Sequence, residues 1–140
     1  MKWHETRAKV RFNEVDSYHV AWHGHYVAWM ELGRNELTAP FGLDADQIAA
    51  AGYLAPVVAL ELKFLRPARF GDQLTIQATL EKTETATLAF ASRIIGPDGK
   101  PCAAGKTIHA FTDMNGELQY TLPLIIRERV VRLAAWLEEE

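Results

Sequence analysis

The sequence from Trp22 to Leu37 reads WHGHYVAWMELGRNEL. Within it, Tyr26, Met30 and Gly33 recur at the spacing of one helix face, and further apolar residues flank them on both sides. An apolar surface this wide predicts a helix that is enclosed by the rest of the chain. At 1.5 Å per residue the helix would span about 24 Å, roughly the width of five strands. We therefore expect a long central helix with a sheet wrapped around it.

Strand-like segments lie on both sides of this helix. Residues 5–12 alternate strictly between apolar and polar side chains, which places Val10 and Phe12 on the same apolar face. Four further runs have strand patterns, and turn signals rich in Gly, Pro and Asp separate them. These runs cover residues 54–65, 73–80, 85–95 and 101–112.

Two more helices are predicted from their ends. Asp44 and Gln47 form a capping-box pattern that opens a short helix over 45–51, and Gly52 supplies a left-handed stop. Pro123 opens an amphipathic helix at the end of the chain. Its apolar face comprises Ile126, Val130, Leu133 and Leu137.

This order of elements predicts one α+β domain over residues 1–140. The architecture is a hotdog fold, in which a five-stranded antiparallel sheet wraps around the long helix and a C-terminal helix follows. Such a sheet has two free edges, and pairing with further copies would protect them. We therefore expect a homodimer or a homotetramer.

The composition excludes several classes of function. The formal net charge is −3, so nucleic acid is not an expected partner. No apolar run approaches the roughly 18 residues that span a membrane. Cys102 is the only cysteine, which rules out an internal disulfide and a thiolate metal site and fits a cytoplasmic protein. Neither serine lies in a nucleophile-elbow motif, and no phosphate-binding glycine loop is present.

The loop before the long helix carries the chemistry. Asp16 should lie near the helix N-terminus, where unpaired N–H groups favour an ionised carboxylate. Those N–H groups could also hold the charge on a carbonyl oxygen under attack, and Gly24 leaves room for a substrate. Thioester hydrolysis suits this pair because its thiol leaving group, with a pKa of about 8.5, needs little protonation. Asp16 could act as general base or nucleophile, or it could only cap the loop.

A set of motifs resembles the 4-hydroxybenzoyl-CoA thioesterase family of hotdog enzymes, which includes the YbgC-like acyl-CoA thioesterases. The motifs are Asp16, His23-x-x-Tyr26, Trp29-x-Glu31-x-x-Arg34 and Arg66-Pro67-Ala68-x-Phe70-Gly71-Asp72. The resemblance implies that Asp16 is the catalytic carboxylate and that the backbone N–H of His23 polarises the thioester carbonyl. It also implies an acyl-CoA or acyl-carrier-protein thioesterase without a cofactor, since coenzyme A is part of the substrate.

Other residues are candidates for substrate binding. Trp22 and Tyr26 are expected to line the acyl pocket. Tyr18 and His19 stand where relatives usually have a glycine-containing loop, so we expect them to reshape that pocket. The phosphates of coenzyme A need cations, and the candidates are Arg66 and Arg69, which could equally belong to a solvated strand face.

Two alternative functions stay open. A hotdog dehydratase or isomerase would need a catalytic histidine, His23 or His25, paired with an acid, whereas a non-catalytic acyl-CoA-binding module would need no ionised carboxylate. Side chains two residues apart on a helix diverge by about 200°, so His23 and His25 are not expected to bind one metal ion. Glu31 and Arg34 are expected to form an ion pair, and Asp72 is expected to fix a turn.

Overall fold

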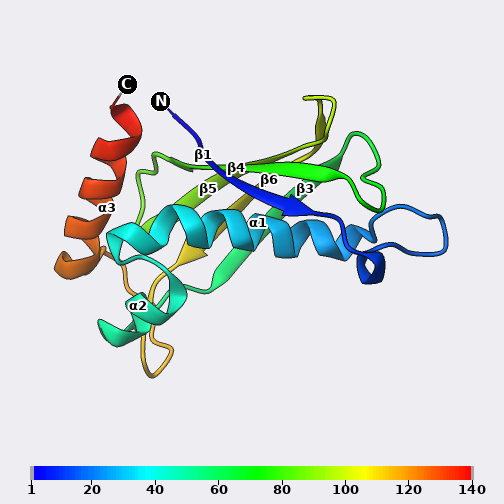
Figure 1. Ribbon diagram of the computed structural model, residues 1–140. Helices are drawn as coiled ribbons and strands as arrows, with labels where there is room; N and C mark the ends of the chain where they lie inside the picture. The colour runs from blue at the N-terminus through cyan, green and yellow to red at the C-terminus, as the bar shows by residue number, and fades with distance from the viewer. Residues whose placement is uncertain (1, 140) are drawn as a thin grey trace.

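Five strands form one antiparallel sheet in a computed structural model that describes residues 2–139 (Figure 1). The strand order is β1-β4-β5-β6-β3, which leaves β1 and β3 at the edges. The strands are β1 (His4–Lys9), β3 (Val57–Phe64), β4 (Gln73–Glu81), β5 (Thr87–Ile95) and β6 (Pro101–Ala110). The predicted five-stranded antiparallel sheet is therefore confirmed.

The long helix α1 (His23–Thr38) lies along one face of this sheet (Figure 1). Tyr26, Trp29 and Met30 are buried between the helix and the strands. Gly33 is needed where α1 meets β4, because a Cβ atom there would lie 2.6 Å from a methyl carbon of Ile76. The apolar face that predicted the helix is thus the face that packs on the sheet.

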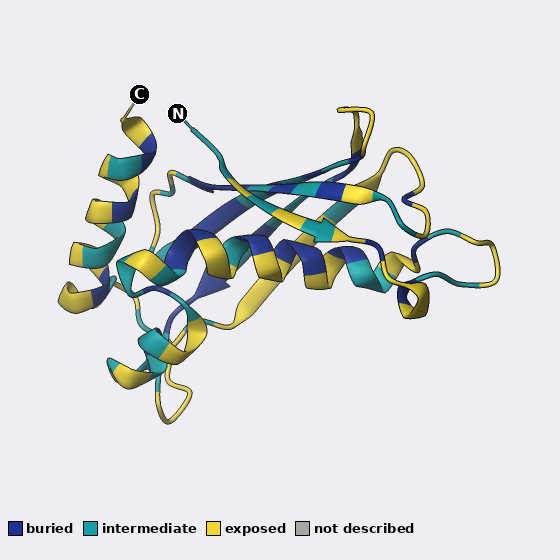
Figure 2. Ribbon diagram, viewed as in Figure 1, coloured by how far each residue is buried: buried dark blue, intermediate teal, exposed yellow. Residues whose placement is uncertain are grey.

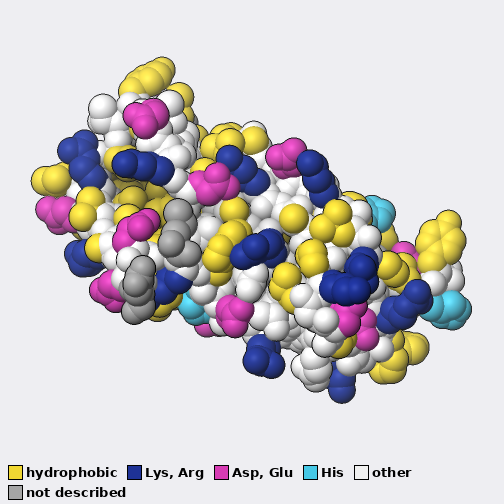
Figure 3. Space-filling view, turned by 90° about the horizontal axis from the view of Figure 1, so that it is seen from above, with side chains coloured by type: hydrophobic (Ala, Val, Ile, Leu, Met, Phe, Trp, Pro, Cys, Tyr) yellow, Lys and Arg dark blue, Asp and Glu magenta, His cyan; other side chains and the backbone are white. Residues whose placement is uncertain are grey.

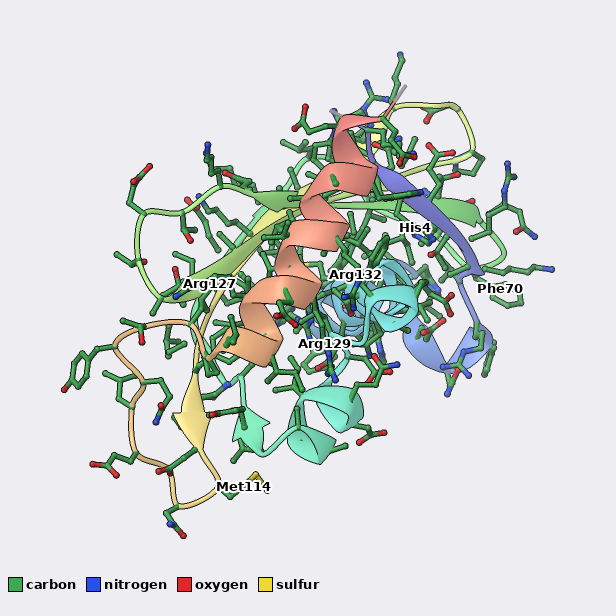
Figure 4. The ribbon with its side chains drawn as sticks, turned by 90° about the vertical axis from the view of Figure 1, so that its left-hand side faces the viewer. His4, Phe70, Met114, Arg127, Arg129 and Arg132 are labelled. Atoms are coloured by element: carbon green, nitrogen blue, oxygen red, sulfur yellow. The ribbon has the colours of Figure 1, made fainter. Side chains whose placement is uncertain are left out.

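The remaining elements extend the core at the other end of the sheet. They are α2 (Ala45–Ala50), a two-stranded pairing of β2 (Tyr53–Leu54) with β7 (Thr112–Asp113), α3 (Leu124–Glu138), and two short 3-10 turns, η1 (Phe12–Glu14) and η2 (Ala39–Phe41). Both hydrogen bonds of the predicted capping box form, between Asp44 and Gln47. Arg129 on α3 donates to the carbonyl of Gly42 at 2.8 Å and ties the helix to η2 (Figure 4).

The helix α3 covers a second apolar cluster with the face that the sequence predicted. Ile126, Leu133 and Leu137 are buried there, together with Leu37 from α1 and Phe111. Among residues 2–139, no helix combines the length and the apolar character of a membrane-spanning segment.

Three expectations about the elements are corrected. The first strand ends at Lys9, and Phe12 lies in η1 with 78% of its surface exposed. Pro56 interrupts the predicted strand over 54–65, because it has no N–H to continue a ladder, so Leu54 belongs to a different sheet. Finally, α1 is covered on one side only: its outer flank, which includes Leu32, is exposed (Figure 2).

A buried histidine joins β6 to the segment before β3. Nδ1 of His109 donates to the carbonyl of Ala55 at 3.0 Å, and the hydroxyl of Thr107 donates to Nε2 at 3.1 Å. Burial lowers the pKa of His109 from its ordinary value of 6.5, with a smaller lowering by Arg34 and opposing effects from the Ala55 carbonyl and Glu31. The neutral imidazole is therefore the form that the fold stabilises.

This histidine predicts a pH dependence of stability. The unfolded chain binds the proton more readily than the folded one, so stability should fall as the pH drops below 6.5, the unfolded-state value. Above 6.5 the residue contributes no slope. We expect His109→Gln to flatten the acid-side decline of the urea midpoint. The control His19→Asn changes an exposed histidine and should keep the wild-type slope; equal slopes in all three proteins would contradict the prediction.

Candidate active site

The chain enters α1 through a small hairpin that is fixed at its base. Val15 and Ala21 pair across it, and the N–H of Trp22 donates to the carbonyl of Glu14 at 2.8 Å. The N–H of Ala21 donates to the carbonyl of Ala68 at 2.7 Å. The first turn of α1 is therefore anchored both to η1 and to the segment that precedes β4.

Glu14 holds the other side of this hairpin. Its side chain is buried, and its Oε1 accepts from the backbone N–H of Arg11 at 2.7 Å. The guanidinium of Arg11 lies 3.4 Å from the same oxygen. A buried carboxylate needs such partners, so this pair stabilises the turn that leads to Asp16.

Asp16 lies in the hairpin and is half-buried. Its Oδ1 accepts from the N–H of Tyr18 at 2.8 Å, and its own N–H donates to the carbonyl of Val20 at 2.9 Å. Within residues 2–139, no donor contacts Oδ2. The carboxylate thus caps the loop with one oxygen and keeps the other oxygen available. Three residues after Asp16, His19 has a positive φ of 66° and its N–H donates to the carbonyl of Asp16 at 2.9 Å, which closes the turn.

The first turn of α1 presents open backbone donors. The N–H groups of His23 and Gly24 find no acceptor among residues 2–139, because the residues before them supply no cap. One expectation about this turn is corrected: the space beside Gly24 is not empty. The indole of Trp22 fills it, so a Cβ at Gly24 would overlap the ring. The same indole contacts the rings of His23 and His25, at centroid distances of 4.9 and 5.6 Å.

An open groove of about 290 Å³ runs beside this turn, between α1, the end of β3 and the segment that follows it. Its lining residues are Val20, Ala21, His23, Tyr26, Phe64, Leu65, Arg66 and Pro67. Of the predicted site residues, the groove brings together His23, Tyr26 and Arg66. Asp16 and Arg69 are its neighbours, because each pairs through its backbone with Val20. Trp22, Gly24, Tyr18 and His19 do not line it.

The sequence reasoning missed Phe64 as a wall of this groove. The ring of Phe64 meets Tyr26 edge-on at 5.2 Å and His23 at 6.5 Å. A signal was present in the sequence, since Leu62 and Phe64 alternate with charged residues and therefore face the same side as α1. What the pattern could not give was the distance from the strand end to the start of the helix.

Tyr26, which lines the groove, and Cys102, in the core, are buried titratable groups. Burial raises the pKa of Tyr26, while the N–H of Ala68, which donates to its hydroxyl at 3.1 Å, lowers it by less. Burial also raises the pKa of the Cys102 thiol. The thiol is therefore protonated and inert, as expected for a small apolar core residue.

The cationic side chains do not gather around the groove. Arg66 pairs with Asp98 at 3.4 Å, and both side chains are half exposed. Lys106 pairs with Glu81 on the far strands, and Arg93 lies over the ring of Trp3. Figure 3 shows basic and acidic side chains intermixed over the face that it displays. Arg66 remains the one predicted cation that lines the groove.

The other polar predictions have clear outcomes. Glu31 and Arg34 form the expected ion pair at 3.0 Å, and Asp72 fixes its turn by accepting from the N–H of Arg69 at 2.9 Å. In the described part of the chain, neither His23 nor His25 has a carboxylate partner, which disfavours the dehydratase alternative. No group of three potential metal ligands occurs within residues 2–139.

A second cavity lies elsewhere, between α3 and the β4–β5 hairpin. It measures about 450 Å³, and its walls include Leu80, Leu88, Val130 and Leu137. Its polar lining residues are Glu81, which pairs with Lys106, and Lys82, Thr83, Thr85, Thr87 and Glu138. The groove at the start of α1 is the better candidate for chemistry, because His23, whose N–H is open, lines it and Asp16 pairs with Val20 of its wall.

Comparisons with known proteins identify the family and the fold. Residues 10–139 match the thioesterase-like superfamily. A chloroplastic acyl-acyl carrier protein thioesterase of Arabidopsis thaliana is 30% identical, over 93% of this chain and 68% of that one. The acyl-CoA thioester hydrolase YbgC of Escherichia coli is 26% identical, over 64% and 67%. A DHNA-CoA thioesterase structure from Staphylococcus aureus superposes with a TM-score of 0.85 at 18% identity, covering 96% and 93%; this confirms the hotdog fold. The resemblance inferred from the motifs is also confirmed.

The overlap of Trp22 and Gly24 can be tested by Gly24→Ala. The new methyl group should displace the indole, because the ring is half exposed and free to rotate outward. The gain in helix propensity, which in the first turn is smaller than the roughly 1 kcal/mol of a helix interior, should partly offset the lost contact and keep the free energy of unfolding within about 1 kcal/mol of wild type. Near-ultraviolet circular dichroism should change.

The control for this experiment is the same substitution in a Trp22→Phe background. A large part of the spectral change should disappear there. An unchanged spectrum for Gly24→Ala in the wild-type background would show that the ring does not lie over Gly24.

Proposed function

The chain belongs to the thioesterase-like superfamily and is a thioester hydrolase, and from this premise we propose that it cleaves an acyl or aroyl thioester of coenzyme A or of acyl carrier protein to a free acid and a thiol. One observation supports the start of α1 as the location of the reaction: His23, whose N–H is open, lines the groove, the open N–H of Gly24 follows it in the same turn, and Asp16 pairs through its backbone with Val20 of the groove wall. The N–H donors of the first turn of α1 and the carboxylate of Asp16 thus belong to adjoining segments that are both anchored to the rest of the chain.

In the proposed mechanism, the thioester carbonyl oxygen accepts from the N–H groups of His23 and Gly24. The positive end of the α1 dipole adds to their effect as charge develops on that oxygen. The indole of Trp22 occupies the space where a Cβ of residue 24 would lie, so in this mechanism the carbonyl enters from the groove, which His23 lines.

The available oxygen of Asp16 either activates the water that attacks the carbonyl carbon or attacks that carbon itself. As a general base it takes a proton from a water molecule that adds to the carbonyl carbon; as a nucleophile it forms a mixed anhydride that water then cleaves. In both routes the tetrahedral carbon expels a thiolate, which needs little assistance because the thiol pKa is about 8.5. The reaction needs no cofactor, since coenzyme A is part of the substrate. The cytoplasmic location is likewise our proposal and rests on the single cysteine.

Asp16→Asn tests this role without removing the loop cap. The Oδ1 of asparagine can still accept from the N–H of Tyr18, so the hairpin should keep its conformation. Loss of the base or nucleophile should lower kcat at least about a hundredfold. Thiol release from a panel of aromatic, short-chain and long-chain acyl-CoAs measures the effect.

The matched control is Asp46→Asn, an exposed carboxylate in the first turn of α2, which should leave kcat unchanged. Full activity of a folded Asp16→Asn protein would refute the proposed role of Asp16. A wild-type protein that binds acyl-CoA and releases no thiol would be the binding module, and the hydrolase proposal would then be wrong.

We further propose that two copies pair through β3. This edge strand carries an apolar strip, Leu60, Leu62 and Phe64, on the side that faces α1, with exposed fractions of 47% for Leu60 and 53% for Phe64 (Figure 2). Open strand edges with apolar side chains are normally covered by another strand. A homodimer formed in this way would continue the sheet, and association of two dimers would give the homotetramer.

Leu60→Lys tests this interface. A lysine in this strip would lose its water in the dimer without gaining a partner. The dimer Kd should therefore rise at least about tenfold, and sedimentation equilibrium measures it. Val131→Lys changes a residue on α3 that is 60% exposed and serves as the control. A Leu60→Lys protein with the wild-type dimer Kd would place the interface elsewhere.

A further inference from the structure

The hydroxyl group of Tyr26 uses only half of its hydrogen-bonding capacity. The side chain is 3% exposed, and its oxygen accepts from the N–H of Ala68 at 3.1 Å. No group among residues 2–139 accepts the hydroxyl hydrogen itself. A buried donor without an acceptor costs free energy, and such groups in native proteins commonly have a partner that is not part of the chain.

The phenol is held in one orientation. Its ring meets Trp29 edge-on at 5.1 Å and Phe64 at 5.2 Å, while Ala68 fixes the position of the oxygen. Only the O–H bond can rotate. Burial raises the pKa of Tyr26, so the hydroxyl stays protonated and remains a donor. A fixed donor loses little conformational entropy when an acceptor binds.

Tyr26 lies where an acyl group would pass. His23 and Tyr26 are one helical turn apart, and both line the groove. Three residues of α-helix rise about 4.5 Å. Side chains on a helix lean toward its N-terminus, so the Tyr26 hydroxyl lies closer to the His23 N–H along the helix axis than this rise. An extended acyl chain advances about 1.2 Å per bond. A thioester whose carbonyl binds at the N–H of His23 and whose acyl group runs along α1 would therefore bring its second or third carbon close to the hydroxyl.

We propose that Tyr26 is a specificity-determining residue that donates a hydrogen bond to an oxygen atom on the second or third carbon from the thioester carbonyl carbon, so that the site prefers oxygenated acyl or aroyl thioesters to plain alkyl ones. This inference rests on the proposed function, because it takes the thioester to bind at the start of α1. It adds a substrate class to a site whose other walls, Val20, Ala21, Phe64 and Pro67, offer apolar contact to any acyl group.

The test compares 3-oxohexanoyl-CoA with hexanoyl-CoA in wild type and in Tyr26→Phe. Loss of one hydrogen bond should lower kcat/KM for the oxo substrate about five- to tenfold more than for the plain one. Comparing each substrate with itself across the two proteins cancels the greater intrinsic reactivity of the oxo thioester. Loosening of the segment at Ala68, the purely structural consequence of losing the hydroxyl, would affect both substrates alike.

Tyr120→Phe is the matched control, since that tyrosine is 86% exposed and should leave both kcat/KM values unchanged. Equal losses for the two substrates in Tyr26→Phe would overturn the inference. A second measurement does not depend on the variant or on turnover. Thioether analogues of the two substrates, with a methylene group inserted between sulfur and carbonyl, should bind wild type with Kd values about five- to tenfold apart, the oxo analogue more tightly.

These arms separate the two proposals. Absence of hydrolysis with tighter binding of the oxo analogue would refute the hydrolytic mechanism and support the role of Tyr26. Hydrolysis of both substrates with equal Kd values for the analogues would support the mechanism and refute that role.

Discussion

The close approach of α1 to the sheet is the constraint on which the rest of the structure depends. It requires glycine on both surfaces: a Cβ at Gly33 would lie 2.6 Å from Ile76, and one at Gly105 would lie 2.7 Å from Met30 and 2.9 Å from the carbonyl oxygen of Glu61. Because both layers are close-packed, the helix axis has little freedom to shift. The position of its first turn, and with it the position of the open N–H groups, follows from packing some 15 Å away along the helix.

The anchored entry to α1 extends this constraint to the groups that we propose for the reaction. The backbone of the hairpin bonds to Glu14 on one side and to Ala68 on the other, and Ala68 also donates to the hydroxyl of Tyr26. One short segment therefore positions both the hairpin that carries Asp16 and the phenol of Tyr26, which lines the groove. Fixed donors of this kind stabilise developing charge without reorganising during the reaction, which is the physical reason to locate the chemistry at this end of the molecule.

The sequence predicted what depends on periodicity and short-range motifs, and it failed where side chains from distant segments compete for space. Helix α1, the five sheet strands apart from their ends, the Asp44–Gln47 cap and the buried face of α3 follow from repeats and caps. Phe12 is exposed because it lies in a turn that the buried carboxylate of Glu14 stabilises. The alternation of apolar and polar residues does not predict that turn. Likewise, the missing side chain of Gly24 predicts free space, but the indole of Trp22, two residues earlier, fills that space. Residue types alone do not show which way that ring turns.

The exposed edge and the groove are not independent features of the fold. Phe64 belongs both to the apolar strip of β3 and to the wall that faces Tyr26 and His23. A strand that pairs with β3 would restrict the exposed side of Phe64 and remove water from the adjoining groove. Lower water content strengthens every electrostatic interaction inside a site, including those of the N–H donors of α1 with a carbonyl oxygen. Because one phenylalanine belongs to both surfaces, assembly and catalysis should respond together to changes at the end of this strand.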